Sequence, residues 1–194
     1  MSIAKLLHYT YDDYKSWEGA WELIDGIPVS MAPAPMKIHQ MIASELFFCL
    51  KQEVDDGCLD CEVLYEMDWK ISNSTTVRPD IVLTCNDNGD RYLIRAPKII
   101  IEILSPSTAQ KDETVKFDIY EEESVQYYIL VYPDDLKAKV YSLKNDNYSK
   151  RGDFTNEKLT FDDIDCDIEL DFKKVFEKFE LPGSTSPEVE PESK

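Results

Sequence analysis

The chain has 194 residues, of which 43% are hydrophobic, so it can fill one ordinary hydrophobic core but not two, and we expect one domain. It carries 39 acidic and 21 basic residues, and the resulting formal charge of -18 makes the surface as a whole repel polyanions. Its apolar runs are too short to span a bilayer, and the N-terminus MSIAKLLHYT lacks the apolar core of a signal peptide, so we expect a cytoplasmic protein with no membrane partner.

The first elements are a helical turn, a hairpin and a long helix. YTYDDYKSW predicts a helical turn that begins at Thr10 or Asp12. WELIDGIPVSMAP predicts a hairpin, because two apolar runs flank Asp25-Gly26, a dipeptide that favours a tight turn. Between Pro35 and Gly57 the apolar residues recur at helical spacing, which predicts the first long helix.

After this helix the pattern changes to strands. Residues 61–71 alternate between apolar and polar, residues 77–85 form a compact apolar run, and residues 96–105 are almost continuously apolar. A second long helix is predicted over residues 107–123, and strands at 125–133 and 137–144 follow it. Continuously apolar strands are typical of a sheet that is buried on both faces, so we expect an α/β fold with a central mixed β-sheet flanked by helices.

The C-terminal part is less regular. RGDFTNEKLTF predicts a short hairpin over residues 151–161, and DFKKVFEKFEL predicts an amphipathic helix over residues 171–181. The last segment, PGSTSPEVEPESK, has the composition of a disordered acidic tail. We therefore expect a single domain over residues 1–181 and a tail over residues 182–194.

The cysteines favour free thiols. There are five, an odd number without a regular framework, which fits a reducing compartment. Cys58 and Cys61, in CLDC, have a spacing seen in metal sites, but no second CxxC pair accompanies them and both histidines lie well upstream. Free thiols are therefore the expectation, rather than a metal site.

Two acids stand in or beside the apolar strands. Glu102 lies inside PKIIIEILSPST, where burial without a partner would be costly. Asp80, in RPDIVL, lies at the start of the preceding strand. If the two strands pair, both carboxylates can point to one face and share a divalent cation. Mg²⁺ suits that arrangement, because it takes oxygen ligands and often only one or two protein carboxylates.

At this point the residues resemble the Uma2 family of restriction endonucleases, within the PD-(D/E)XK nuclease superfamily. The resemblance is carried by ELIDG, APAPMKIHQMIASEL, RPDIVL, PKIIIEILSPST, DETVKFDIY and VQYYILVYP. It implies a restriction-endonuclease-like core with the element order α-β-β-β-α-β, preceded by the N-terminal hairpin. It also implies hydrolysis of phosphodiester bonds in nucleic acid, most naturally DNA, that depends on Mg²⁺ or Mn²⁺. Nucleases of this fold often dimerise to cut two strands, so a homo-oligomer, with a dimer favoured, is expected.

The sequence departs from the superfamily pattern at Leu104, where the motif places a lysine two residues after the acid. The resemblance implies that Lys116, from the following helix, supplies this lysine instead. Asp80 and Glu102 would then hold the metal, while Lys116 orients the attacking water and offsets charge on the phosphate.

Five further residues are secondary candidates for the same site: Glu22, His39, Glu45, Asp112 and Tyr120. Asp112 and Tyr120 lie four residues to either side of Lys116, so the three form one stripe on a helix. Nucleases of this fold often add an acid from outside the two core strands, and Glu22 is favoured over Glu45 because ELIDG belongs to the resemblance. The histidine, on the first long helix, is placed near the same cleft.

Structural interpretations and other functions stay open. Lys116 could simply neutralise Glu102 as a buried pair, and Asp112 suits the first turn of a helix. The alternatives to a nuclease are a catalytically inactive binding module on the same fold and a homo-oligomeric adaptor with protein partners. A nuclease needs basic residues near its site, and the sequence offers a group between residues 70 and 116: Lys70, Arg78, Arg91, Arg95, Lys98, Lys111 and Lys116.

Overall fold

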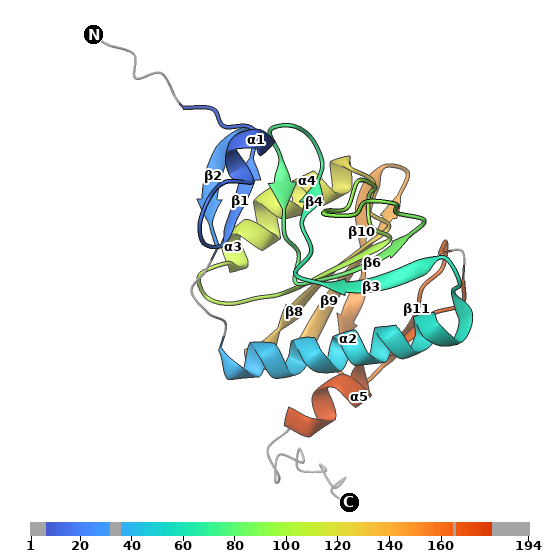
Figure 1. Ribbon diagram of the computed structural model, residues 1–194. Coiled ribbons are helices and arrows are strands. Elements are labelled where there is room, and N and C mark those ends of the chain that lie inside the picture. The colour runs from blue at the N-terminus through green and yellow to red at the C-terminus, as the bar shows by residue number, and fades with distance from the viewer. Residues whose placement is uncertain (1–6, 32–35, 165, 180–194) are drawn as a thin grey trace, which may run out of the picture.

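A mixed β-sheet of six strands lies at the centre of the protein (Figure 1). The computed structural model describes residues 7–31, 36–164 and 166–179, so the predicted domain end at 181 and the tail over residues 182–194 lie outside the described residues. The strand order is β10-β9-β8-β7-β6-β3, and every neighbouring pair is antiparallel except β7 and β8. The strands are β3 (Cys61–Tyr65), β6 (Ile81–Cys85), β7 (Ile99–Ile103), β8 (Tyr127–Tyr132), β9 (Lys137–Lys144) and β10 (Asn147–Phe154).

Helices pack on one face of this sheet. The long helix α2 (Lys37–Gly57) and the short helix α5 (Phe172–Phe176), which the 3-10 turn η3 (Glu177–Phe179) continues, lie together on this side (Figure 1). Their apolar side chains share one buried cluster with residues of the central strands, including Ile81, Ile101 and Ile129. The short hairpin of β11 (Lys158–Thr160) and β12 (Glu169–Asp171) closes the end of this core.

The opposite face carries a second helical run and a small sheet. The run consists of α3 (Ala109–Lys111), the π-helical turn η1 (Asp112–Lys116) and α4 (Phe117–Glu122). The small antiparallel sheet has the order β2-β1-β5-β4. Its strands are β1 (Trp21–Ile24), β2 (Ile27–Ser30), β4 (Trp69–Lys70) and β5 (Thr76–Val77). Because both faces are covered, all five residues of β7 are buried, Glu102 included, which explains its nearly continuous apolar sequence.

The N-terminal hairpin is confirmed, and its turn chemistry is the expected one. Asp25 and Gly26 connect β1 to β2 with φ angles of 49° and 73°, the left-handed values that a tight two-residue hairpin turn requires. Just before the hairpin, helix α1 (Tyr11–Tyr14) begins after Thr10, which forms a reciprocal cap with Asp13.

Two of the predicted strands are each divided between the two sheets. The run 61–71 contains β3 of the central sheet and β4 of the small sheet, and the run 77–85 follows the end of β5 into β6. The first division falls at Glu66, which has a φ of 47°. The second falls at residues 78–80, so Asp80 lies where the chain passes from the small sheet into the central sheet.

The predicted hairpin over residues 151–161 is wrong. Strand β10 pairs with β9 instead, and β11 pairs with β12. The turn between β9 and β10 is formed by Asn145 and Asp146, which have φ angles of 50° and 63°. This asparagine-aspartate pair is the stronger turn signal, because such residues tolerate the left-handed conformation. The predicted C-terminal helix is shorter than expected, with a single α-helical stretch before the 3-10 turn. Over the described residues, no helix has the length and apolar character needed to cross a bilayer.

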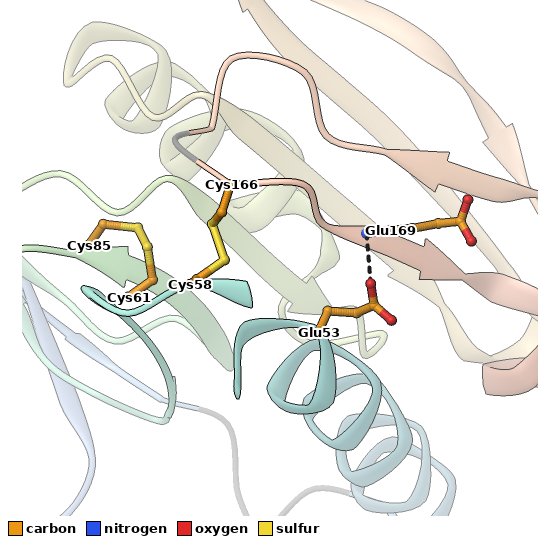
Figure 2. Close-up of a disulfide and its surroundings, with 6 residues drawn as sticks. All are labelled: Glu53, Cys58, Cys61, Cys85, Cys166 and Glu169. Carbon is orange, nitrogen blue, oxygen red and sulfur yellow. Dashed lines mark hydrogen bonds between the residues drawn. A yellow bond between two sulfur atoms is a disulfide. The ribbon is translucent and has the colours of Figure 1, made fainter. Parts of the chain in front are cut away.

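The expectation of free thiols is wrong for four of the five cysteines. Cys58 is bonded to Cys166, and Cys61 is bonded to Cys85 (Figure 2). The partners are separated by 108 and 24 residues, so their pairing depends on the fold and does not show in local spacing. Cys49, on α2, is free and half-buried.

Candidate active site

A cleft of about 510 Å³ opens where β6 begins and β7 ends. Asp80 and Glu102 line it from the central sheet, Lys111 and Lys116 line it from the helical run, and His39 lines it from α2. The strand register explains why the two acids meet. Ile81, the first residue of β6, pairs with Ile101 in the antiparallel ladder. Asp80 comes one residue before this pair and Glu102 one residue after it, so both acids lie at the same end of the ladder.

Each of these two acids has one oxygen engaged and one free. Oδ2 of Asp80 accepts a hydrogen bond of 2.7 Å from the backbone N–H of Ile103. Oε1 of Glu102 accepts hydrogen bonds from Lys116 Nζ at 2.8 Å and from the Tyr120 hydroxyl at 2.9 Å. Among the described residues, Asp80 Oδ1 and Glu102 Oε2 have no hydrogen-bond partner. Each acid therefore has one oxygen left for a ligand in the cleft.

Lys116 lies at the centre of a buried group of carboxylates. Its Nζ is 2.8 Å from Glu102 Oε1, 3.0 Å from Glu22 Oε1 and 3.5 Å from Asp112 Oδ1, and the residue is only 2% exposed. Burial acts to lower the pKa of Lys116, but Glu102, Glu22 and Asp112 outweigh it and hold the pKa well above its usual range. Lys116 is therefore a positively charged group at neutral pH and cannot serve as a general base there.

The π-helical turn accounts for the contacts of this helix. Hydrogen bonds in a π-helix connect residues five apart, and such turns are frequent at functional sites. Lys111 and Lys116, five residues apart, both reach Glu22, with Lys111 Nζ 2.5 Å from Oε2. The hydroxyl of Tyr128, on β8, donates a hydrogen bond of 2.9 Å to the backbone carbonyl of Asp112 and fastens the turn to the central sheet.

Glu22 is fixed by three donors although it is completely buried. It accepts from the backbone N–H of Arg78 at 3.0 Å as well as from the two lysines. Burial acts to raise the pKa of Glu22, but Lys116, Lys111 and the Arg78 N–H outweigh it, so the pKa is lowered. Glu22 is consequently a stable buried negative charge that connects the small sheet to the helical run.

For Glu102 and Asp112 burial prevails, so the net shift of the pKa is opposite to that of Glu22. Burial raises the pKa of Glu102 well above the usual range, with Lys116 acting against it and the neighbouring acids adding to it. It also raises the pKa of Asp112, whose Oδ1 is buried without a hydrogen-bond partner among the described residues. Three carboxylates, those of Glu22, Glu102 and Asp112, thus surround Lys116, and Lys111 shares one of them.

His39 and Tyr120 each contact one of the two central acids, His39 contacting Asp80 and Tyr120 contacting Glu102. His39 Nε2 is 3.3 Å from Asp80 Oδ2, and although burial acts to lower the pKa of His39, Asp80 outweighs it and raises the pKa. Tyr120 is completely buried, stacks on Trp69 and contacts Glu102 through its hydroxyl. It holds the carboxylate and does not line the cleft.

Glu45 is not brought to the cleft. It lies farther along α2 and pairs with Lys178 of η3 at 2.7 Å, on the other side of the central sheet. Lys111 is the residue that the sequence did not single out for the site. In the sequence it belongs only to the basic group between residues 70 and 116. It lies five residues before Lys116, so it is not on the stripe of residues spaced four apart.

The oxygen atoms available in the cleft suit an open site for Mg²⁺ or Mn²⁺ better than a closed site in which the protein supplies every ligand. Among residues 7–31, 36–164 and 166–179, no three carboxylate or imidazole ligand atoms of this cleft lie within 4.8 Å of one another. Two carboxylate oxygens are available, and Mg²⁺ is commonly bound through one or two carboxylates while water and substrate phosphate complete its shell.

The mixed sheet flanked by helices, with an N-terminal antiparallel strand pair, is a nuclease-like fold, and Asp80, Glu102 and Lys116 line one cleft in it. The chain belongs to the Uma2 family, because residues 11–171 match the family model, which is described as "Putative restriction endonuclease". The resemblance inferred from sequence is thereby confirmed.

The known proteins that are similar to this chain include a curated relative and a solved structure. The uncharacterised protein slr1290 of Synechocystis is 31% identical over 146 residues, which cover 70% of this chain and 74% of that protein. A crystal structure from Anabaena variabilis, described as "a putative nuclease belonging to DUF820", has the same fold, with a TM-score of 0.68 at 20% sequence identity. The match covers 87% of this chain and 97% of that one, so the expected fold class is confirmed.

Proposed function

We propose that this protein is a Mg²⁺-dependent nuclease, with Mn²⁺ as a substitute, that hydrolyses phosphodiester bonds of nucleic acid, most naturally DNA. One observation carries the proposal: Asp80 and Glu102 each keep one carboxylate oxygen free in a cleft that also contains the charged Lys116. The family, described as restriction endonucleases, supports the same class of chemistry.

The two free oxygens, Asp80 Oδ1 and Glu102 Oε2, are the atoms that would hold the metal. When bound, a divalent cation supplies a Lewis acid for the phosphoryl oxygens and lowers the pKa of a coordinated water. The residues around the acids keep these oxygens directed into the cleft. Lys116 and Tyr120 both engage Oε1 of Glu102, and the backbone N–H of Ile103 engages Oδ2 of Asp80.

Lys116 contributes positive charge rather than proton abstraction. Its raised pKa keeps it protonated, and its position between Glu22 and Glu102 fixes the ammonium without a need for reorganisation during the reaction. A fixed cation in a site that excludes water stabilises charge that develops on a phosphate. His39 is placed to hold a proton at Nε2 and to keep Asp80 in one orientation.

The net charge of the protein gives the cation a second role. At -18 the molecule repels a polyanion, and the cleft itself has more acids than lysines. We therefore expect nucleic acid to bind only when a divalent cation is present. A homodimer, which would let two sites cut two strands, and a cytoplasmic location belong to the same proposal.

Cleavage assays test the activity. Supercoiled plasmid and single-stranded DNA are incubated with Mg²⁺ or Mn²⁺ and wild type, Asp80→Ala, Glu102→Ala or Glu45→Ala. Wild type and Glu45→Ala should cleave, because Glu45 faces away from the cleft, and the other two variants should not. Cleavage that survives both Asp80→Ala and Glu102→Ala would come from a contaminant and would remove the basis for this function.

One observation favours a second candidate, a catalytically inactive binding module. Lys116 already has three carboxylates within 3.5 Å and is almost completely buried, as a purely structural ion network would be. Titration calorimetry separates the two. A nuclease should give a heat of Mg²⁺ binding that disappears in Asp80→Ala. A purely structural ion network should give no such heat.

A further inference from the structure

Four of the five cysteines come together at the end of α2, outside the cleft (Figure 2). Cys58 directly follows α2 and caps it, because its N–H donates to the Val54 carbonyl at 2.8 Å. Cys61 is the first residue of β3 and Cys85 the last residue of β6. Cys166 lies just before β12. Three separate parts of the chain therefore deliver sulfur atoms to one place.

The sulfur atoms lie closer together than two independent disulfides require. The Sγ atoms of Cys58, Cys61 and Cys166 are all within 4.8 Å of one another, although Cys61 is not bonded to either of the other two. Cys85 lies outside this group of three but is bonded to Cys61. A disulfide needs only its own two sulfurs to meet, so nothing in disulfide formation demands that the two bonds be neighbours.

Contacts other than the disulfides hold the same segments together. Cys61 and Cys85 are direct partners in the ladder between β3 and β6, so their side chains leave the same face of the sheet side by side. The backbone N–H of Asn86 donates to the carbonyl of Asp60 at 2.8 Å. Glu53 of α2 accepts a hydrogen bond of 3.3 Å from the backbone N–H of Glu169, which fixes the segment after Cys166 against the helix (Figure 2). The thiols should therefore remain together after reduction.

We propose that in the reduced protein these four cysteines bind one Zn²⁺ as a structural site with four thiolate ligands. Zinc takes four thiolates at about 2.3 Å in a tetrahedron, which sets neighbouring sulfurs roughly 3.8 Å apart. The sulfurs of Cys58, Cys61 and Cys166 reach that spacing by small side-chain rotations, and Cys85, which its disulfide holds next to Cys61, joins them when the bonded pairs open on reduction. Disulfide and metal are alternative states, because a sulfur in a disulfide carries no thiolate charge.

The chemistry of this cluster separates it from the cleft. Thiolates select soft cations such as Zn²⁺, whereas the carboxylate oxygens of Asp80 and Glu102 suit Mg²⁺. Cys58 and Cys85 are each only 8% exposed, and Cys61 and Cys166 are half-buried, so the site is closed to a substrate as structural zinc sites are. The ion would join α2, the β3–β6 edge of the central sheet and the β11–β12 hairpin. None of these ligands lines the cleft.

Metal analysis of the reduced full-length protein tests the proposal. Wild type and variants are purified under a strong non-chelating reductant, thiol content is verified by mass spectrometry, and zinc is measured by plasma mass spectrometry. We expect one Zn²⁺ per chain in wild type and in the control Cys49→Ser, because Cys49 lies outside the cluster. Cys58→Ser and Cys166→Ser should lose at least about ten-fold in bound zinc. Replacement by Co²⁺ should give the charge-transfer absorption of a tetrathiolate site.

Two results would overturn the proposal. One is fully reduced wild type that takes up neither Zn²⁺ nor Co²⁺, whether or not it remains folded by circular dichroism. The other is zinc that stays bound in both Cys58→Ser and Cys166→Ser, because the ion would then lie elsewhere. Since the first result is obtained on wild type alone, failure of a variant to fold does not block the test.

Discussion

Replacement of Lys116 by methionine should be among the most destabilising single changes in this protein. The side chain of methionine has nearly the length of lysine without its charge, so Lys116→Met leaves Glu22, Glu102 and Asp112 buried without their shared cation. Removal of one partner of a buried ion pair typically costs about 3–5 kcal/mol, because the remaining charge is desolvated and uncompensated. Relaxation by proton uptake should keep the loss near the lower end of that range.

The pH dependence of this loss follows from the pKa values of the acids. In wild type, Lys116 acts to lower the pKa of each of the three acids, while burial acts to raise it. Without the lysine the folded-state pKa values of Glu102 and Asp112 rise further above the unfolded values, and that of Glu22 rises from its lowered position. The folded variant therefore binds more protons than folded wild type. Its stability relative to wild type consequently increases as pH falls toward the unfolded pKa, and the deficit should shrink between pH 8 and about pH 5.

Urea unfolding at a series of pH values, followed by circular dichroism, measures this deficit. Lys178→Met is the matched control, because Lys178 makes an exposed ion pair with Glu45 and its loss should leave the midpoint unchanged within error. A deficit below about 1 kcal/mol for Lys116→Met, or one that grows as the pH falls, would refute the buried network as described.

Three further predictions concern the residues around the two central acids. Tyr120→Phe removes one hydrogen bond to Glu102 Oε1, and it should cost about 1–2 kcal/mol in urea unfolding and reduce plasmid cleavage without abolishing it. His39→Gln should lose stability at low pH only. The folded pKa of His39 is raised above 6.5, so its contribution to stability is fully present below that pH and disappears as the pH rises through the folded pKa. Equal deficits at pH 6 and pH 9 would contradict this. Asp80→Asn should weaken Mg²⁺ binding at least about ten-fold by calorimetry while thermal unfolding in EDTA changes little, and unaltered binding would exclude Asp80 as a ligand.

Local chemistry explains which parts of the fold the sequence predicts. The hairpin at Asp25-Gly26 and the cap at Thr10 are encoded by adjacent residues, and both occur as expected. The division of the two strand runs between sheets depends on tertiary pairing, which local sequence does not encode. In the structure the first run changes sheet at Glu66, where the backbone is left-handed. The hairpin predicted over residues 151–161 does not form, because Asn145 and Asp146 make the turn and pair β10 with β9.

In the candidate site, too, some residues can be placed from the sequence and others only from the folded structure. Asp80 and Glu102 are placed by strand pattern alone, since pairing of two buried strands leaves few registers. The role of Lys111 is not visible in the sequence, because a regular α-helix puts residues five apart on different sides and only the π-helical turn brings Lys111 and Lys116 to the same acid. The disulfide partners were missed for a simpler reason, since Cys58 and Cys166 are 108 residues apart and meet only in the folded chain.

The burial of Glu22 against two lysines has a consequence for the order in which the protein becomes competent. Glu22 is made early by the ribosome, whereas Lys111 follows 89 residues later and Lys116 later still. Neither the N-terminal hairpin nor the helical run holds a complete set of charges by itself. A nascent chain therefore cannot complete this ion network until both sheets have formed and docked.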